Sequence, residues 1–577
     1  MPPQQPTSKF VIEVNGSPLP EAVDRTVVSV FVDDSLNLPD MFQLTFRDPA
    51  RTAIAEGGFT MGAMVAVRVF SDAVPGGEKL ITGEVTALEA EFDPGGTMTV
   101  IRGFDPSHRL FRGRITETYT DVTYSDVATK VARRAGLTVG KVDSATTVHK
   151  HVSQGNVTDW QFLKGMAAEI GYEVGCFDGK FEFRKPTRSS EGPQAGTLST
   201  DDPLQLVLGT NLLRFRTTIT SAEQVKEVNV RGWDMRQKKP LIGTAPAETI
   251  TAAVGVKPTE LAAAFGNPSY VGVNTPYVTQ AEVDGAAKAL AEQIAGAFAE
   301  FEGVARGNPK LRAGKAVSLG LVASPFDGRY TLTTTRHVYD PKDGYIVWFT
   351  VSGRQERSLL GLTSGGAGGN GSAGPPIHGV AAALVTDVKD PDDLGRVKLK
   401  FPWLSDSYTT DWARLVQFGA GKQRGSVMLP EVNDEVLVAF EQGDIRRPYV
   451  IGGLFNGVDK PTLGNGLVDG STGAVKRRGF ISKKGHKLVF LDDAAKSGVL
   501  LATADNGFRI ALKETGTTIK VSSKGAVEIE AATTVSIQAK SNVEIKAQGQ
   551  MKLQAGAGLT IDGGPSVEVK GGVIKLN

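Results

Sequence analysis

The segment from Ile519 to Val569 reads IKVSSKGAVEIEAATTVSIQAKSNVEIKAQGQMKLQAGAGLTIDGGPSVEV and repeats one pattern every eight residues. Each repeat has two aliphatic residues separated by one polar residue, and a small residue stands two positions after the second aliphatic. Because successive side chains of a strand point to opposite faces, these three positions share one face. The pattern therefore predicts strands with one apolar face and one polar face.

The pattern has seven consecutive matches, which we call octads. Hexapeptide β-helices need a period of six, and calcium-binding nonapeptide repeats need a period of nine with a Gly-Gly-x-Gly-x-Asp motif, so neither fits. The aliphatic pairs are Ile519 and Val521, Val527 and Ile529, Val535 and Ile537, Val543 and Ile545, Met551 and Leu553, Leu559 and Ile561, Val567 and Val569. The small residues are Ser523, Ala531, Ala539, Ala547, Ala555, Gly563 and Gly571.

One octad can neither bury its apolar face nor satisfy the backbone groups along both of its edges. Three copies of the chain wound about one axis solve both problems. Each octad then forms one side of a triangular prism, the aliphatic side chains point to the axis, and each edge meets a neighbouring copy. At about 4.8 Å per strand, the seven octads predict an intertwined trimeric β-helix roughly 35 Å long.

The composition indicates a multidomain protein that is mainly β with a few helices. A chain of 577 residues is too long for one hydrophobic core, and 68 glycines with 7% aromatic residues favour turns and strands. The net charge of +1 gives no overall attraction to nucleic acid or to an anionic membrane. The single cysteine, Cys176, excludes an intrachain disulfide framework. We find no signal peptide and expect synthesis in the cytoplasm.

Hydrophobic periodicity predicts three helices, beginning at Ser125, Thr158 and Thr279 and ending near Gly136, Gly171 and Glu302. Strands are predicted around them and again over residues 377–456, where five short strands fit a small barrel of the OB type. Between these regions, residues 361–376 are rich in glycine and predict a flexible linker.

Several motifs resemble one family over nearly the whole chain. The stretches His378-Gly-Val, Asp390-Pro-Asp-Asp-Leu-Gly-Arg-Val, Phe401-Pro-Trp-Leu, Leu429-Pro-Glu-Val-Asn-Asp-Glu-Val and Arg447-Pro-Tyr-Val-Ile-Gly-Gly-Leu-Phe-Asn-Gly457 resemble the OB domain of VgrG proteins and phage baseplate spikes. The stretch Arg102-Gly-Phe-Asp-Pro-Ser-His-Arg-Leu-Phe-Arg-Gly113 is similar to the tail hub of phage late control protein D. The segment Lys484-Gly-His-Lys-Leu-Val-Phe-Leu-Asp-Asp493 is similar to the neck before the needle.

The resemblance implies an order of domains along the chain. We expect β-barrel hub domains, an OB-fold collar and a C-terminal needle, and we recognise no motif over residues 187–260. The expected boundaries are a tail-hub-like region at 1–360, the linker at 361–376, the OB domain at 377–457, a neck at 458–484 and the β-helix needle at 485–577.

What the resemblance implies about function is a homotrimeric structural spike of a contractile, phage-tail-like injection system. The hub would join the inner tube and baseplate, and the needle would carry a PAAR-type tip protein into a target membrane, with effector cargo as a further partner. We expect the tip protein to dock on Val573, Ile574 and Leu576. The motifs leave open whether the particle is a phage, a type VI system or an extracellular machine.

Two other functions compete with this interpretation. Some spikes of this family carry a lysozyme domain before the needle, but only about 20 residues, from Val458 to Lys476, are available here, so we expect no enzyme. An OB fold also raises nucleic-acid binding, with Trp403, Tyr408 and Trp412 as stacking candidates. Residues 378–457 hold nine Lys and Arg against eleven Asp and Glu, which argues against that alternative.

The remaining candidate sites have simpler interpretations, and we expect no cofactor, metal or catalytic residue. A β-turn explains Asp390, Asp392 and Asp393, because no Glu closes a calcium loop. Zinc needs a third ligand beside His149 and His151. His108 and His337 lack a nearby nucleophile motif and are expected to make structural hydrogen bonds.

Overall fold

A computed structural model describes residues 8–71, 74–196, 202–340, 342–354, 376–463, 466–493 and 496–575. The chain divides into two compact units, Met1–Val458 and Asp459–Asn577. Residues 361–375 of the expected linker lie outside the described residues. No helix in the described ranges is long and apolar enough to cross a membrane. The expectation of a mainly β chain with a few helices is confirmed.

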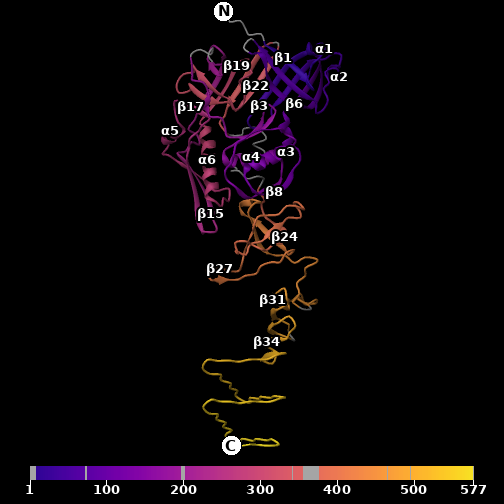
Figure 1. Cartoon of the computed structure of the whole chain (residues 1–577), viewed down its shortest axis with the longest axis vertical. Helices are drawn as coiled ribbons and strands as arrows, with labels where there is room; N and C mark the ends of the chain where they lie inside the picture. Colours follow the sequence, from indigo (N-terminus) through magenta and orange to yellow (C-terminus); the bar gives the residue numbers. More distant parts are fainter. Residues whose placement is uncertain are drawn as a thin grey trace, which may run out of the picture. The chain divides into compact units, whose positions relative to one another are not determined.

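The first unit is built on an 11-stranded sheet to which two distant parts of the chain contribute (Figure 1). Alternating apolar residues of its strands, such as Val30, Val32, Phe42 and Leu44, are 0% exposed. In spatial order, the strands are β14 (Leu212–Ile219), β19 (Ala299–Arg306), β23 (Gly344–Val351), β22 (Thr334–Asp340), β3 (Val27–Ser35), β4 (Met41–Arg47), β7 (Gly96–Phe104), β6 (Val74–Asp93), β5 (Met64–Ser71), β1 (Lys9–Val14) and β2 (Ser17–Pro18). Two short helices, α1 (Glu21–Asp24) and α2 (Ala53–Glu56), flank it.

A second core lies in the part of the chain inserted between the two halves of this sheet. Helices α3 (Tyr124–Arg134) and α4 (Asp159–Ile170) pack there with strands β8 (Ile115–Val122), β10 (His149–Val157), β9 (Val139–Val142), β11 (Glu173–Phe177) and β12 (Lys180–Arg184). Both helices begin with a capping box, on Thr123 and Thr158, so the N-cap of α3 is Thr123 and the expected Ser125 cap is wrong. Gly171 ends α4 in the left-handed conformation.

The predicted third helix is shorter than expected. Helix α6 (Gln280–Gly296) begins at the predicted capping box of Thr279 and Glu282, but the chain after Gly296 turns into β19. The stretch from Ala299 to Arg306 pairs with β14 and β23, and its Phe301 enters the core between them. Strand pairing therefore overrides the helical periodicity of this stretch.

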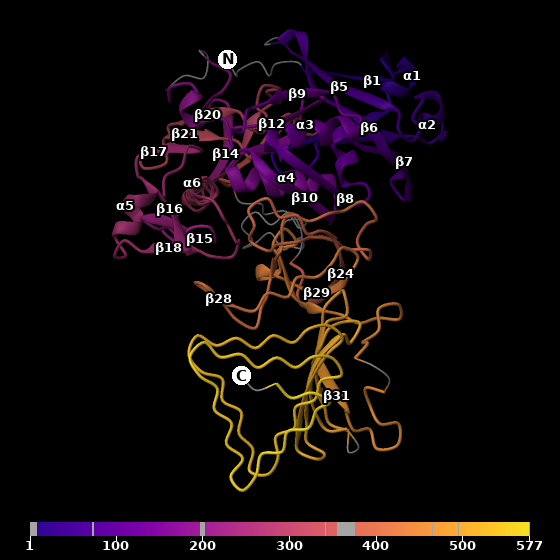
Figure 2. The same ribbon diagram turned by 60° about the horizontal axis from the view of Figure 1, so that its bottom comes forward.

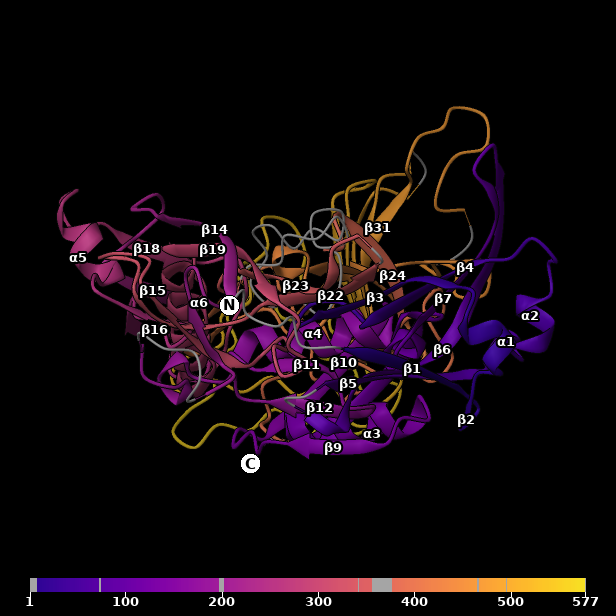
Figure 3. The same ribbon diagram turned by 90° about the horizontal axis from the view of Figure 1, so that it is seen from above.

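Helix α6 covers one face of a small sheet, β16 (Lys239–Pro246), β15 (Glu227–Asp234) and β18 (Ser269–Gly272), as Figure 3 shows. A further sheet has the order β13 (Gln205–Val207), β20 (Ala316–Gly320), β21 (Gly328–Thr331) and β17 (Ala252–Val254), and α5 (Pro258–Ala263) lies between β17 and β18 in the chain. Strands β13, β15, β16 and β17 lie within residues 187–260, in which we recognised no motif.

The OB domain ends the first unit. Its sheet has the order β25 (Lys398–Lys400), β24 (Val380–Asp387), β29 (Glu435–Phe440), β30 (Pro448–Gly453) and β26 (Arg414–Leu415), and a hairpin adds β27 (Ala420–Gly421) and β28 (Arg424–Gly425). Alternate residues of these strands form one core around Phe401 and Val438, both 0% exposed. The five predicted short strands are therefore present.

The second unit begins with a five-stranded antiparallel sheet whose strands pair in chain order: β31 (Arg477–Ile481), β32 (Lys487–Leu491), β33 (Gly498–Ala502), β34 (Phe508–Lys513) and β35 (Thr518–Ser523). Beyond β35 the chain runs in three-sided turns (Figure 2). No strand or bridge is assigned within residues 524–575, all of which the structure describes.

Candidate assembly site

The 14 aliphatic residues of the octads are all exposed in the single chain. Their exposed fractions run from 51% at Met551 to 75% at Ile519. Large apolar side chains that recur at fixed spacing on one face, without any covering element, form an apolar surface that a soluble protein covers with a partner. The described part of the second unit contains no element that covers them, so the octads are the first candidate site of assembly.

The first octad differs from the others because it lies in a strand that is paired on one side. Strand β35 pairs with β34, with Ile519 opposite Leu512 and Val521 opposite Ile510. No described strand of the same chain pairs with its other edge. The chain continues from β35 into the remaining octads, in which no strand is assigned. Strand pairing within one copy therefore stops at β35.

The expected tip-docking residues lie at the end of the second unit. Val573 is 78% exposed and Ile574 is 52% exposed, whereas Leu576 lies outside the described residues. These two exposed aliphatic residues form an apolar surface, and the nature of its partner belongs to the proposal below.

A buried charge cluster joins helices α3 and α4 to the OB domain within the first unit. We call this contact the hub–collar junction, since it joins the expected hub region to the OB-fold collar. The guanidinium of Arg446 donates to Glu169 on α4 at 3.0 Å and to Asp444 at 2.9 Å. The hydroxyl of Tyr124 donates to the other oxygen of Glu169. Burial raises the pKa of Glu169, whereas the pKa of Asp444 is lowered, since the Arg446 guanidinium outweighs the opposing effect of burial.

Packing and neutral hydrogen bonds surround this cluster. A methyl group at Gly155 would lie 3.0 Å from the side chain of Ile445, so β10 and the OB domain are in close contact. The Nε2–H of His151 donates to the carbonyl of Thr409 at 2.9 Å, and the hydroxyl of Tyr408 donates to Ser153 at 3.2 Å. This hub–collar junction was not predicted from the sequence. The sequence feature that could have indicated the junction is Glu169, an acidic residue at helical spacing from the buried Phe162 and Met166 of α4.

His149 and His151 lie on one face of β10, beside this junction. His149 stacks on Tyr124 at 4.1 Å and lies 3.9 Å from Glu282, and burial lowers the pKa of both histidines. Arg446 and Arg447 line the same small cavity of about 30 Å³, and their charges oppose a bound cation. No cluster of three or more metal-ligating side chains occurs in the ranges that the structure describes.

The other sequence candidates take structural positions. Tyr408 is 1% exposed and belongs to the OB core, so it offers no base-stacking surface. Asp390 makes two bonds to the Arg396 side chain within the expected turn. His108 bonds Glu84 at 2.7 Å, and the buried His337 bonds the Tyr345 hydroxyl at 2.8 Å.

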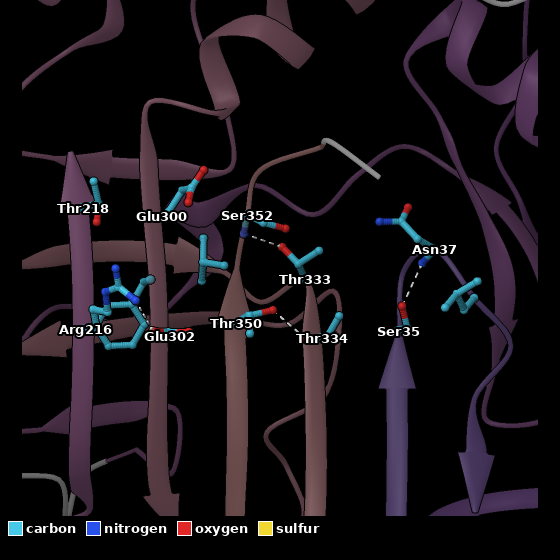
Figure 4. A pocket seen from close by; sticks show the side chains of 13 residues that line it. Ser35, Asn37, Arg216, Thr218, Glu300, Glu302, Thr333, Thr334, Thr350 and Ser352 are labelled. Carbon is cyan, nitrogen blue, oxygen red and sulfur yellow. Dashed lines mark hydrogen bonds and ion pairs between the residues drawn. The ribbon is translucent and has the colours of Figure 1, made fainter. Parts of the chain in front are cut away.

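Two adjoining pockets lie beside the 11-stranded sheet and share Ser35, Thr334 and Thr350 among their lining residues. The smaller, of about 460 Å³, is lined by hydroxyl groups and by Glu300 and Glu302 of β19 (Figure 4). The Thr334 and Thr350 hydroxyls bond each other at 2.5 Å. The backbone N–H of Ser352 donates to the Thr333 hydroxyl at 3.0 Å, and the backbone N–H of Asn37 donates to the Ser35 hydroxyl at 3.1 Å. The larger pocket, of about 1030 Å³, is mostly apolar and includes Trp348.

Two known families match the chain. The type VI secretion system/phage-baseplate injector OB domain matches residues 381–455. The Alg8 N-terminal domain matches residues 4–340, which is more than half of the chain.

Among characterised proteins, the type VI secretion system spike protein VgrG3 of Vibrio cholerae is 30% identical over 132 residues, which are 22% of this chain and 13% of that protein. VgrG1c of Pseudomonas aeruginosa is 36% identical over 90 residues, which are 14% of this chain and 12% of that protein. The match therefore spans about an eighth of the length of these relatives.

A solved Francisella PdpA-VgrG complex is similar in structure, with a TM-score of 0.54 over 90% of this chain and 80% of that one. The sequence identity is 8%, so this likeness shows the fold alone.

Proposed function

We propose that the chain, which belongs to the Alg8 N-terminal domain family and to the VgrG-like central spike proteins of contractile injection systems, is a homotrimeric spike. In this proposal the hub joins the inner tube and baseplate, and the octads of three copies form the membrane-puncturing needle. The observation that carries the proposal is the row of octads, which are apolar and exposed and, from the second octad onward, unpaired within one chain.

Three copies provide what a single chain lacks. Each aliphatic side chain that moves from water to an apolar axis contributes about 1.5–3 kcal/mol before chain entropy is subtracted. Each backbone edge gains a neighbouring strand, which removes the aggregation risk of an open edge. A needle held in this way is stiff and unfolds slowly, as a puncturing device requires.

The proposal assigns the end of the needle to a tip protein of the PAAR type. Val573 and Ile574 provide the apolar surface, and Leu576 completes the set expected from the sequence. A solved spike of this fold is in complex with PdpA, which supports the proposal that a spike carries other proteins, including effector cargo.

Deletion of residues 571–577 tests this assignment in co-purification with the tip protein. We expect the deletion to lose the tip protein and to leave the trimer intact, whereas the matched variant Lys575→Ala keeps both. Unchanged tip retention after the deletion would contradict the proposed docking surface.

An envelope-degrading enzyme is the second candidate, and purified protein tests it directly. We propose that the chain acts mechanically, because the relatives that it matches are spike proteins and only about 20 residues separate the OB domain from the strands that follow it. Clearing of a peptidoglycan suspension by the purified full chain would contradict a purely structural role, and we expect none.

A further inference from the structure

The polar faces of the octads carry charges in a fixed order. The positions between the paired aliphatics are Lys520, Glu528, Ser536, Glu544, Lys552, Thr560 and Glu568. The positions after the second aliphatic are Ser522, Glu530, Gln538, Lys546, Gln554, Asp562 and Lys570. Both sets alternate with the aliphatic residues, so both point away from the axis in the proposed needle.

Threefold symmetry decides which of these residues are neighbours, provided that the proposed trimer holds. The same octad of three copies lies at one level on three sides of the prism, and each chain advances by one side and one level per octad. On any one side, an octad of one copy is therefore followed by the next octad of another copy. In-register neighbours are thus eight residues apart in sequence and belong to different copies, at about 4.8 Å between strands.

The charges fit this neighbour rule in both columns. Residues eight positions apart give three pairs of opposite charge, Lys520 with Glu528, Glu544 with Lys552, and Asp562 with Lys570, and they give no pair of like charge. Opposite charges directly across neighbouring strands are stabilising, and like charges are destabilising.

A needle folded from a single copy fits the charges less well. Three octads per turn would stack residues 24 positions apart. This spacing gives two opposite pairs, Lys520–Glu544 and Glu528–Lys552, but also two like pairs, Glu544–Glu568 and Lys546–Lys570. In the described chain the turns are unpaired, and the ion pairs of residues 524–575 lie within one octad, Lys546 with Glu544 and Lys570 with Glu568. Lys520 and Glu528 make no ion pair within their own copy in these described ranges.

We propose that ion pairs between copies, Lys520–Glu528, Glu544–Lys552 and Asp562–Lys570, set the register in which three copies of this chain wind together. The partner of each octad edge is a second copy of the same chain. The apolar pattern alone repeats in every octad and cannot distinguish a slip by one octad. The charges can, because a slip of one copy by one octad brings identical octads side by side at one of its edges and opposes each charged residue there to its own like. At its other edge residues sixteen positions apart become neighbours, which opposes Glu528 to Glu544 and leaves the opposite pairs Glu530–Lys546, Lys546–Asp562 and Lys552–Glu568.

Charge reversal in the full-length chain tests the inference. The variants are Lys520→Glu, Glu528→Lys and the double variant, and the readout is the half-life of the trimer in hot detergent. Each single change creates three like-charged contacts per trimer, so we expect a half-life about tenfold shorter, and we expect the double variant to recover the wild-type value within about twofold. Lys540→Glu is the matched control, since its neighbours eight positions away, Ala532 and Gln548, are uncharged.

The outcome separates the register from the trimer itself. A trimeric double variant that decays at least as fast as both single variants overturns the ion-pair register and leaves the proposed trimer standing. A wild-type chain that is monomeric overturns both.

Discussion

In the 11-stranded sheet, Val30, Val32 and Leu44 are 0% exposed, whereas Ile519, Ile529 and Ile537 of the octads are 68–75% exposed. Both regions alternate apolar and polar residues along extended chain. The hub sheet meets its own helices and strands, so its apolar face is buried within one copy. Apart from the pairing of β35 with β34, the octads contact no covering element in the described part of their own copy. The same local pattern therefore produces a closed fold in one region and an assembly surface in the other.

The largest effect is expected from a charge placed on the needle axis. Ile545→Asp brings three carboxylates to one apolar level, and an unpaired buried charge costs several kcal/mol at each site. We expect loss of the detergent-resistant trimer, measured by native mass, while far-ultraviolet circular dichroism shows the hub still folded.

The matched control for this change is Gln548→Asp, which places the same charge on the outward face, where its neighbours eight positions away, Lys540 and Gly556, carry no negative charge. It should keep the trimer. Loss of the trimer in both variants would show that the two faces are not distinct and would remove the contrast between hub and needle.

An intermediate effect is expected at the hub–collar junction, where the chain buries charges within one copy. Arg446→Met leaves Glu169 and Asp444 buried without their cation, which costs about 3–5 kcal/mol for a broken buried ion pair. Chemical denaturation should detect this loss in the first unit, with the needle trimer unchanged.

Arg216→Met serves as the comparison, because the Arg216–Glu302 pair is 81% and 58% exposed and such pairs contribute about 0–1 kcal/mol. Equal losses of unfolding free energy in the Arg446 and Arg216 variants would mean that the junction is open to solvent.

The smallest effect is a pH dependence of the same junction. Burial lowers the pKa of His149 and His151 below the usual 6.5, so the folded state stays neutral where the unfolded chain binds protons. Their contribution to stability is present above about pH 6.5 and is lost as the pH falls below it. The raised pKa of Glu169 has the opposite sign, since its contribution is present at low pH and is lost as the pH rises.

The double variant His149→Gln/His151→Gln retains Glu169, so its difference from the wild type isolates the histidines. Lowering the pH from about 7.5 to about 5.5 should lower the melting temperature of the wild type more than that of the variant, as measured by thermal unfolding. Parallel pH profiles would assign no role to the two histidines.

The sequence was sufficient where one period dominates. The helix start at Thr158, the capping box at Thr279 and the alternating OB strands need only local neighbours to be recognised, and the described structure contains them. The octad positions were equally visible, although their burial by other copies stays a proposal. In each of these cases the pattern and its physical consequence lie within one short stretch of chain.

The sequence was insufficient where distant residues decide the outcome. The helix predicted to reach Glu302 ends at Gly296, because the residues from Ala299 onward form strand β19, which pairs with β14 and β23. The junction joins Arg446 to Glu169, which lie far apart in the chain, and no local pattern connects them. Such contacts depend on the tertiary fold and not on periodicity.

Native mass spectrometry of the purified full chain is the most direct test of the intertwined needle. The account predicts a species near 183 kDa, three times the chain mass of 61.1 kDa, that survives strong detergent until it is boiled. A stable monomer of 61.1 kDa, with its octad aliphatics in contact with water, would contradict it.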